Sequence, residues 1–200
     1  MAEDNTLSQD ASQSPAEVHK GSGFAVENAP VRWYIAECKP TKEGIIRTML
    51  TKASYEVYVA SRVEEKVYKS RNRRKVEKIV IPGKVFVRTV DTQLMPIMVG
   101  YSSVHRFMIN RLSEDRSFAY VPDDQMQQLQ YMLGNASNPV FLTAANLKLN
   151  QKVKVMRGAL TGLEGWYYKE GHTSYVVIKM EMGSSHYIYT EVPLDDIQPV

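Results

Sequence analysis

Apolar and polar residues alternate along several stretches of the chain, and between these stretches apolar residues recur at helical spacing. Alternation predicts strands, and apolar residues gathered on one face predict helices. The predicted order is strand, helix, strand, hairpin, strand, helix, strand, helix. This order indicates an α/β sandwich in which helices pack on a mainly antiparallel sheet. The predicted strands are 31–38, 55–60, 79–90 and 104–109, the hairpin is 62–78, and the predicted helices begin at Pro40, Asp91 and Pro122.

The pattern changes on either side of this region. Residues 1–30 have no periodicity and are rich in Ser, Gln, Ala, Asn and Glu, which predicts a disordered tail. Residues 135–150 carry Asn, Ser and Pro without a helical period and are predicted to be a linker. Short strands separated by turn residues follow over 151–200, which is typical of a small all-β barrel. The predicted fold class is therefore α+β, with an α/β sandwich over 31–134 and a barrel after it.

The formal net charge of +3 is unevenly distributed. Residues 1–30 hold five acids and one base, a charge of −4, so the remainder carries +7. The predicted hairpin at 62–78 holds eight bases and three acids, with its bases concentrated at the tip. Such a tip can neutralise phosphates of a nucleic acid, or it can be a solvated edge whose charge resists aggregation. The candidate phosphate-binding residues are Lys69, Arg71, Arg73, Arg74 and Lys75.

Catalytic and metal-binding patterns are missing from the sequence. The four histidines are scattered, and a single cysteine, Cys38, excludes an intrachain disulfide. We therefore expect no catalytic residue, no metal and no cofactor, and a protein that is not an enzyme. No apolar run approaches the ~20 residues of a membrane span, and no signal pattern opens the chain. We expect a cytoplasmic protein without a membrane partner.

Three segments resemble one protein family. The strand and glycine loop at 152–165 resemble the KOW motif, "WYIAECK" at 33–39 resembles the first strand of the NGN domain, and "VIPGKVFVRT" at 80–89 resembles a later NGN strand. NGN, linker and KOW in this order is the architecture of NusG-type transcription factors. The resemblance implies an NGN domain at 31–134 and a KOW domain at 151–200. The residues that match the KOW motif are Val153, Val155, Gly158, Gly162 and Gly165.

The resemblance also implies a partner and a contact surface. NGN domains of this family bind the clamp helices of RNA polymerase through a hydrophobic depression and suppress pausing and termination. The matching positions are Tyr34, Ile81, Val85 and Phe86, and Leu94 and Met95 match a segment that meets the opposite side of the polymerase. Strand alternation leads us to expect that some of the first four point outward. We expect Phe86→Ala to leave melting near native and to weaken binding to the clamp helices about tenfold or more.

Within the family, the chain most resembles the specialised UpxY-type antiterminators, which act on long surface-polysaccharide operons of Bacteroides-like bacteria. Two alternatives stay open: a housekeeping elongation factor that acts genome-wide, and a KOW-containing RNA-binding or ribosome-associated protein. The resemblance implies a monomer that contacts nucleic acid of the elongation complex. It also implies a termination factor or a ribosomal protein as candidate partners of the KOW domain.

Overall fold

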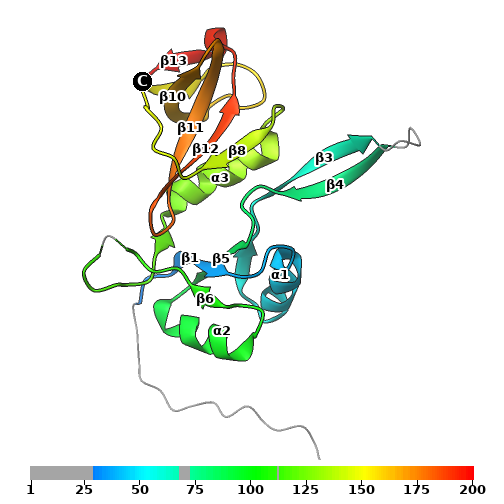
Figure 1. Ribbon diagram of the computed structural model, residues 1–200, viewed down its shortest axis with the longest axis vertical. Coiled ribbons are helices and arrows are strands. Elements are labelled where there is room, and N and C mark those ends of the chain that lie inside the picture. The colour runs from blue at the N-terminus through cyan, green and yellow to red at the C-terminus, as the bar shows by residue number, and fades with distance from the viewer. Residues whose placement is uncertain (1–28, 68–72, 112) are drawn as a thin grey trace, which may run out of the picture.

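The computed structural model describes residues 29–67, 73–111 and 113–200. They form two antiparallel sheets, a separate hairpin and three α-helices (Figure 1). We call β1 to α3 the α/β unit and β8 to β13 the β unit. Residues 1–28 of the predicted tail, and the predicted site residues Lys69 and Arg71, lie outside the described residues. The predicted α+β fold class, with an all-β domain at the C-terminal end, is confirmed.

The sheet of the α/β unit has the order β2-β5-β1-β6, and β7 pairs with β1 beside β6. The two central strands run antiparallel, with Arg32 opposite Thr89 and Glu37 opposite Lys84. Their middle residues are buried on both faces, which explains the continuous apolar run "VFV" at 85–87. The strands are β1 (Arg32–Glu37), β2 (Glu56–Tyr58), β5 (Lys84–Thr89), β6 (Arg106–Phe107) and β7 (Tyr120–Val121).

Helices cover both faces of this sheet. The helices α1 (Glu43–Lys52) and α2 (Leu94–Gly100) bury Ile46, Leu50, Leu94 and Ile97 in one core cluster. A short 3-10 helix at Asp91–Gln93 leads into α2. On the other face lies α3 (Asp123–Asn135), which begins after Pro122 with two acids in its first turn, a favourable position beside the helix dipole.

The β unit is a six-stranded sheet with the order β13-β9-β10-β11-β12-β8. Every pairing in it is antiparallel. One strand, β8, lies inside the predicted linker at 135–150 and pairs with β12, so this segment contributes to the sheet. The strands are β8 (Val140–Thr143), β9 (Lys152–Val155), β10 (Glu164–Glu170), β11 (Thr173–Glu181), β12 (Ser185–Glu191) and β13 (Ile197–Pro199), and a 3-10 helix at Leu194–Asp196 precedes the last.

The residues that match the KOW motif have clear structural roles. Val153 and Val155 alternate into the core of the β unit from β9. Gly162 has a φ of 92°, a left-handed conformation that L side chains rarely adopt. At Gly165 a Cβ atom would lie 2.7 Å from the carbonyl oxygen of Val177, so β10 approaches β11 too closely for any side chain there. The valines and these glycines therefore shape the strand and turn that the motif predicts.

One helix joins the two units. In Figure 1, α3 lies between the sheet of the α/β unit and the β unit. Its Met126 and Leu129 share one core cluster with Val153 and Ile178 of the β unit. The Tyr131 hydroxyl also donates a 2.7 Å hydrogen bond to the Thr161 carbonyl oxygen. The inner surface of the β unit is thus closed by a helix of the α/β unit.

Candidate functional site

The expected polymerase-contact residues lie mostly in the core. Tyr34, Ile81, Val85 and Phe86 are all buried, and so is Leu94. The expectation that strand alternation turns some of the first four outward is wrong. Alternation does place Val85 and Phe86 on opposite faces, but α1 and α2 cover one face and α3 covers the other. Side chains on either face of this sheet are therefore covered by helices and do not reach solvent.

Phe86 is the clearest case. Its side chain is 0% exposed and belongs to the core cluster on the α3 face. The ring centroid lies 6.3 Å from that of Tyr58 on the neighbouring strand β2, which pairs with Phe86 in register. Tyr58 is half-buried, and this burial raises its pKa to about 12. Phe86 packs the core in this arrangement, so Phe86→Ala is expected to destabilise the fold and not to leave melting near native.

Met95 differs from the other predicted contact residues. Its side chain is 54% exposed on α2. Val99, one helical turn further along, is 82% exposed and shares its side of the helix, because residues four apart lie on one face. Together they form a small apolar patch on the outer side of α2, whereas Leu94 beside them anchors the helix in the core.

A groove lies where the β3–β4 hairpin leaves the α/β unit. The hairpin consists of β3 (Ser61–Val67) and β4 (Arg73–Ile79), and its described part projects away from both sheets in Figure 1. The groove runs between the hairpin base and the end of α3 and includes Val63, Glu77, Leu133 and Ala136. Val63 is apolar and yet 63% exposed, and the apolar Leu133 and Ala136 line the groove with it, beside the polar Ser61, Arg62 and Glu77. We call this feature the hairpin groove.

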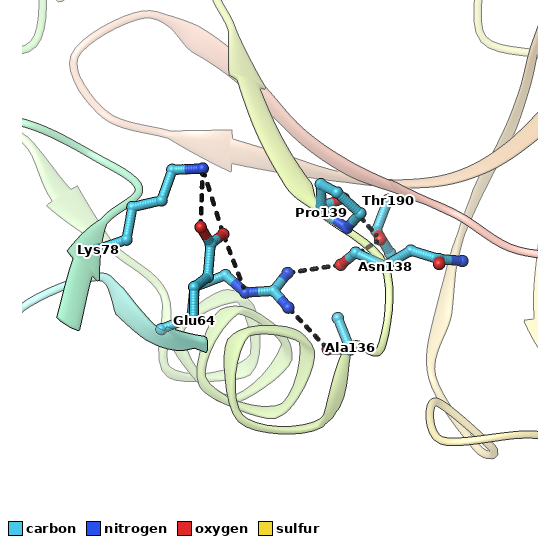
Figure 2. A network of polar contacts seen from close by, with 7 residues as sticks. Glu64, Lys78, Ala136, Asn138, Pro139 and Thr190 are labelled. Carbon is cyan, nitrogen blue, oxygen red and sulfur yellow. Dashed lines mark hydrogen bonds and ion pairs between the residues drawn. The ribbon is translucent and has the colours of Figure 1, made fainter. Parts of the chain in front are cut away.

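Arg62 lines the hairpin groove. Figure 2 shows Glu64 and Lys78 of the hairpin beside Ala136 and Asn138 in the segment after α3. The Arg62 guanidinium donates to the carbonyl oxygens of Ala136, at 3.1 Å, and Asn138, just beyond α3. On the hairpin side, Glu64 lies 3.6 Å from the Arg62 guanidinium and 3.2 Å from the Lys78 ammonium. A planar guanidinium suits two carbonyl acceptors, which a lysine could not engage in the same geometry. The Arg62 network thus ties the hairpin to the segment after α3.

The same segment is tied to the β unit. The side-chain amide of Asn138 donates to the Glu191 carbonyl oxygen at 3.0 Å. The Thr190 hydroxyl donates to the carbonyl oxygen of Pro139 at 3.0 Å. A chain of hydrogen bonds therefore runs from the hairpin through residues 136–139 to β12.

The described part of the hairpin is basic but partly paired. Arg73 is 70% exposed at its side chain and lies 3.5 Å from Glu65 across the strands. Arg74 and Lys75 are exposed on β4. Nearer the base, Glu77 accepts hydrogen bonds from Arg47 and Ser61, which lower its pKa. Exposed basic side chains are therefore gathered on the outer part of β4.

The described ranges contain no group of three His, Cys, Asp or Glu residues placed to hold a metal ion. Burial raises the pKa of the Cys38 thiol to about 11, with the nearby Glu43 carboxylate adding to the effect, so this thiol is protonated at neutral pH. Among the described helices, none has the length and apolar character needed to cross a membrane.

Sequence patterns missed the residues that make the accessible features. Val63 sits in a charged stretch and Val99 near a helix end, so neither belongs to a recognisable apolar motif. Arg62 looks like one of many hairpin bases, and its role depends on carbonyl groups more than seventy positions later. The available signal was Val63 itself, an apolar residue among charges on a predicted strand.

Comparison with known proteins gives the family. The model of the family described as "Transcription termination factor nusG" matches residues 31–130, half of the chain. A search of curated proteins found no match. Among solved structures, the chain is similar to Thermotoga maritima NusG, from a structure described as "Domain interaction in Thermotoga maritima NusG". The two chains share 16% identity with a TM-score of 0.43, and the match covers 86% of this chain and 98% of the other. This chain is also similar to a chain of the MjSpt4:Spt5 complex, with 13% identity, a TM-score of 0.27, and coverage of 84% and 97%. On the family match, the chain belongs to the NusG family of transcription factors.

Proposed function

We propose that the protein binds RNA polymerase through its α/β unit and acts, without catalysis of its own, as an elongation and antitermination factor. The observation that carries the proposal is the family match over residues 31–130, because this range spans every strand of the α/β sheet and most of α3. The factor holds the polymerase clamp over nucleic acid and thereby reduces pausing and termination.

The hairpin groove supplies the contact with the clamp helices in this proposal. A helical partner can bury its own apolar face against exposed apolar side chains of a groove. Val63 is the reachable residue, and Leu133 and Ala136 form the wall. The residues Tyr34, Ile81, Val85 and Phe86 contribute indirectly, because they pack the two core clusters of the α/β unit. Met95, with Val99, provides a second contact on α2.

The hairpin tip is assigned to nucleic acid of the elongation complex. The exposed bases toward the tip, with Lys69 and Arg71 in the sequence between the strands, fit phosphate contacts that position a protein without selecting a base sequence. The competing interpretation is a charged hairpin that only resists edge-to-edge pairing. Salt dependence of binding distinguishes the two.

The specialised UpxY-type role on long surface-polysaccharide operons is the finer form of the proposal, and it rests on the motif resemblance. A housekeeping factor and a KOW-containing RNA-binding protein remain its competitors. Mapping polymerase occupancy with and without the protein separates all three. Readthrough confined to a few long operons supports the specialist, a genome-wide change supports the housekeeping factor, and unchanged occupancy contradicts both.

The biochemical test is transcription by purified polymerase across an intrinsic terminator. We expect the protein to raise readthrough and shorten pauses in proportion to its concentration. An excess of an isolated clamp-helix fragment is expected to abolish the effect, because it competes for the hairpin groove. Readthrough that does not change with the protein, or that survives the fragment, would contradict the proposed mode of action.

A further inference from the structure

Four aromatic rings meet on the outer face of the β unit, away from α3. The Tyr189 ring on β12 is at their centre, with centroids 5.4 Å from Phe141, 5.4 Å from Tyr175 and 6.3 Å from Tyr168. Tyr168 and Tyr175 are themselves 5.9 Å apart. The rings come from four neighbouring strands, β8, β12, β11 and β10. We call Phe141, Tyr168, Tyr175 and Tyr189 the aromatic face.

Register places these rings outside the core. Tyr168 lies opposite Tyr175, and Tyr189 lies opposite Phe141, so each pair shares one side of the sheet. Their strand neighbours Val176 and Ile188 point the other way into the core cluster. Phe141 is 44% exposed and the three tyrosines are half-buried. Cross-strand packing alone can explain touching rings, but it does not require an exposed Phe at the sheet edge.

Two carboxylates border the aromatic face. Glu170 follows Tyr168 by two residues on β10, and Glu191 follows Tyr189 by two on β12, so both share its side of the sheet. Glu191 also lies directly opposite Tyr175. Both glutamates are exposed, and neither forms an ion pair with another residue that the structure describes. This end of the face therefore carries negative charge beside electron-rich rings.

The other end of the same face already holds a cation on a ring. The Lys152 ammonium lies 5.5 Å from the centroid of Trp166, which precedes Tyr168 by two residues on β10. Lys179 on β11 is exposed on this side as well, because it lies four residues after Tyr175 and every second side chain of a strand points to the same face. The bases Lys152 and Lys179 thus lie toward Trp166, where Glu164, paired with Lys154, and Glu181 are also found. Glu170 and Glu191 lie beside the aromatic face.

We propose that the aromatic face, with Glu170 and Glu191, is a docking surface for a basic, arginine-bearing segment of another protein. Guanidinium groups stack on aromatic rings and donate to carboxylates, and the face offers both at one place. Charge complementarity decides against nucleic acid, because two carboxylates at the rim would repel phosphates. The proposal concerns the β unit only and does not depend on polymerase binding by the hairpin groove.

The test uses the full-length protein and an acetylated peptide of alternating arginine and glycine, with a serine–glycine peptide as a neutral control. Binding is followed at low salt through the amide resonances of the three tyrosines and Phe141, so that peptide bound elsewhere is not counted. We expect saturable shifts at these four residues with the arginine peptide alone. The double variant Glu170→Gln/Glu191→Gln should weaken the affinity about three- to tenfold.

Two further variants make the result decisive. Phe141→Ser removes an exposed ring and should weaken binding, with its melting checked because β8 is a short edge strand. Glu164→Gln is the matched control, since Glu164 is an exposed carboxylate of β10 already paired with Lys154 at 2.9 Å, and it should leave the affinity unchanged. Absence of shifts at the aromatic face, or equal affinity in the Glu170→Gln/Glu191→Gln protein, would overturn the proposal. Shifts of the same resonances by oligouridylate instead of the peptide would also overturn it and assign the surface to nucleic acid.

Discussion

The centre of the α/β sheet and the hairpin groove both present apolar residues, but only the groove is open to a partner. Phe86 lies at the sheet centre with 0% exposure, whereas Val63 lies in the groove with 63% exposure. Both belong to strands, Phe86 within a continuous apolar run and Val63 among charged residues. The difference arises because helices cover both faces of the sheet, while the hairpin leaves the sheet and keeps one side uncovered. The residues that maintain the fold and the residues that meet a partner are therefore different sets.

The first prediction concerns the stability of the fold and tests whether Phe86 is buried at the centre of the sheet. Phe86→Ala should lower the free energy of unfolding by about 3–5 kcal/mol, because it removes a buried ring from a packed core. Chemical denaturation measures the change, and Met95→Ala, an exposed apolar residue of the same unit, is the control with an expected change within about 0.5 kcal/mol. Near-native stability of the Phe86→Ala protein would place the ring at the surface after all.

A second change loosens the hairpin without touching the sheet. Arg62→Ala should cost about 1–3 kcal/mol, because two part-buried carbonyl groups lose a charged donor. Hydrogen exchange at residues 136–140 should rise in the same protein. Arg62→Lys keeps the charge but not the planar fork, so it should recover only part of the loss. Unchanged exchange in the Arg62→Ala protein would show that the Arg62 network does not hold this segment.

A third change addresses charge at the hairpin tip. Arg71, Arg73 and Arg74 changed together to Ala should preserve the fold, weaken binding to elongation complexes, and flatten its dependence on salt, since fewer counterions are released. The control removes three exposed bases elsewhere in the same unit, Lys39, Lys42 and Lys52. If both triple variants show the parental salt slope, the hairpin serves only as edge protection.

The smallest expected effect is a dependence on acid. Burial raises the pKa of Glu37, but hydrogen bonds from Lys84 and Arg106 outweigh it and hold this pKa below its usual value of 4.5. A lowered folded-state pKa stabilises the protein above about pH 4.5 and loses that contribution as pH falls through the folded value. The stability difference between the parent and Glu37→Gln should therefore shrink below pH 4.5 in denaturation measurements. A difference that stays constant down to pH 3 would contradict this assignment.

Sequence patterns predicted the regular elements well where the local signal was strong. The helix that begins after Pro122 and the strand at Lys84–Thr89 match the predictions, because capping residues and continuous apolar runs are local properties. Three short strands, β7, β8 and β13, were not predicted. Each has two to four residues and depends on a partner strand far along the chain, as β8 does on β12.

Site prediction was less successful for a physical reason. Motif similarity points to residues of the sheet, and alternation predicts that some of them are exposed. Coverage by helices is a tertiary property that a single strand cannot reveal. Val63 and Arg62 acquire their surroundings only when the end of α3 returns to the hairpin base. The aromatic face likewise depends on strand register across β8, β10, β11 and β12.

The most direct test of polymerase binding by the hairpin groove measures polymerase affinity for Val63→Glu and for Leu194→Glu. The second variant alters an apolar residue of similar exposure, 56%, in the β unit. Both variants should melt like the parent, because neither side chain is buried. We predict that Val63→Glu weakens binding to the clamp helices about tenfold or more, since it puts a charge into the apolar contact of the hairpin groove, and that Leu194→Glu binds like the parent. Parental affinity in the Val63→Glu protein would contradict the assignment of the hairpin groove as the polymerase-binding site.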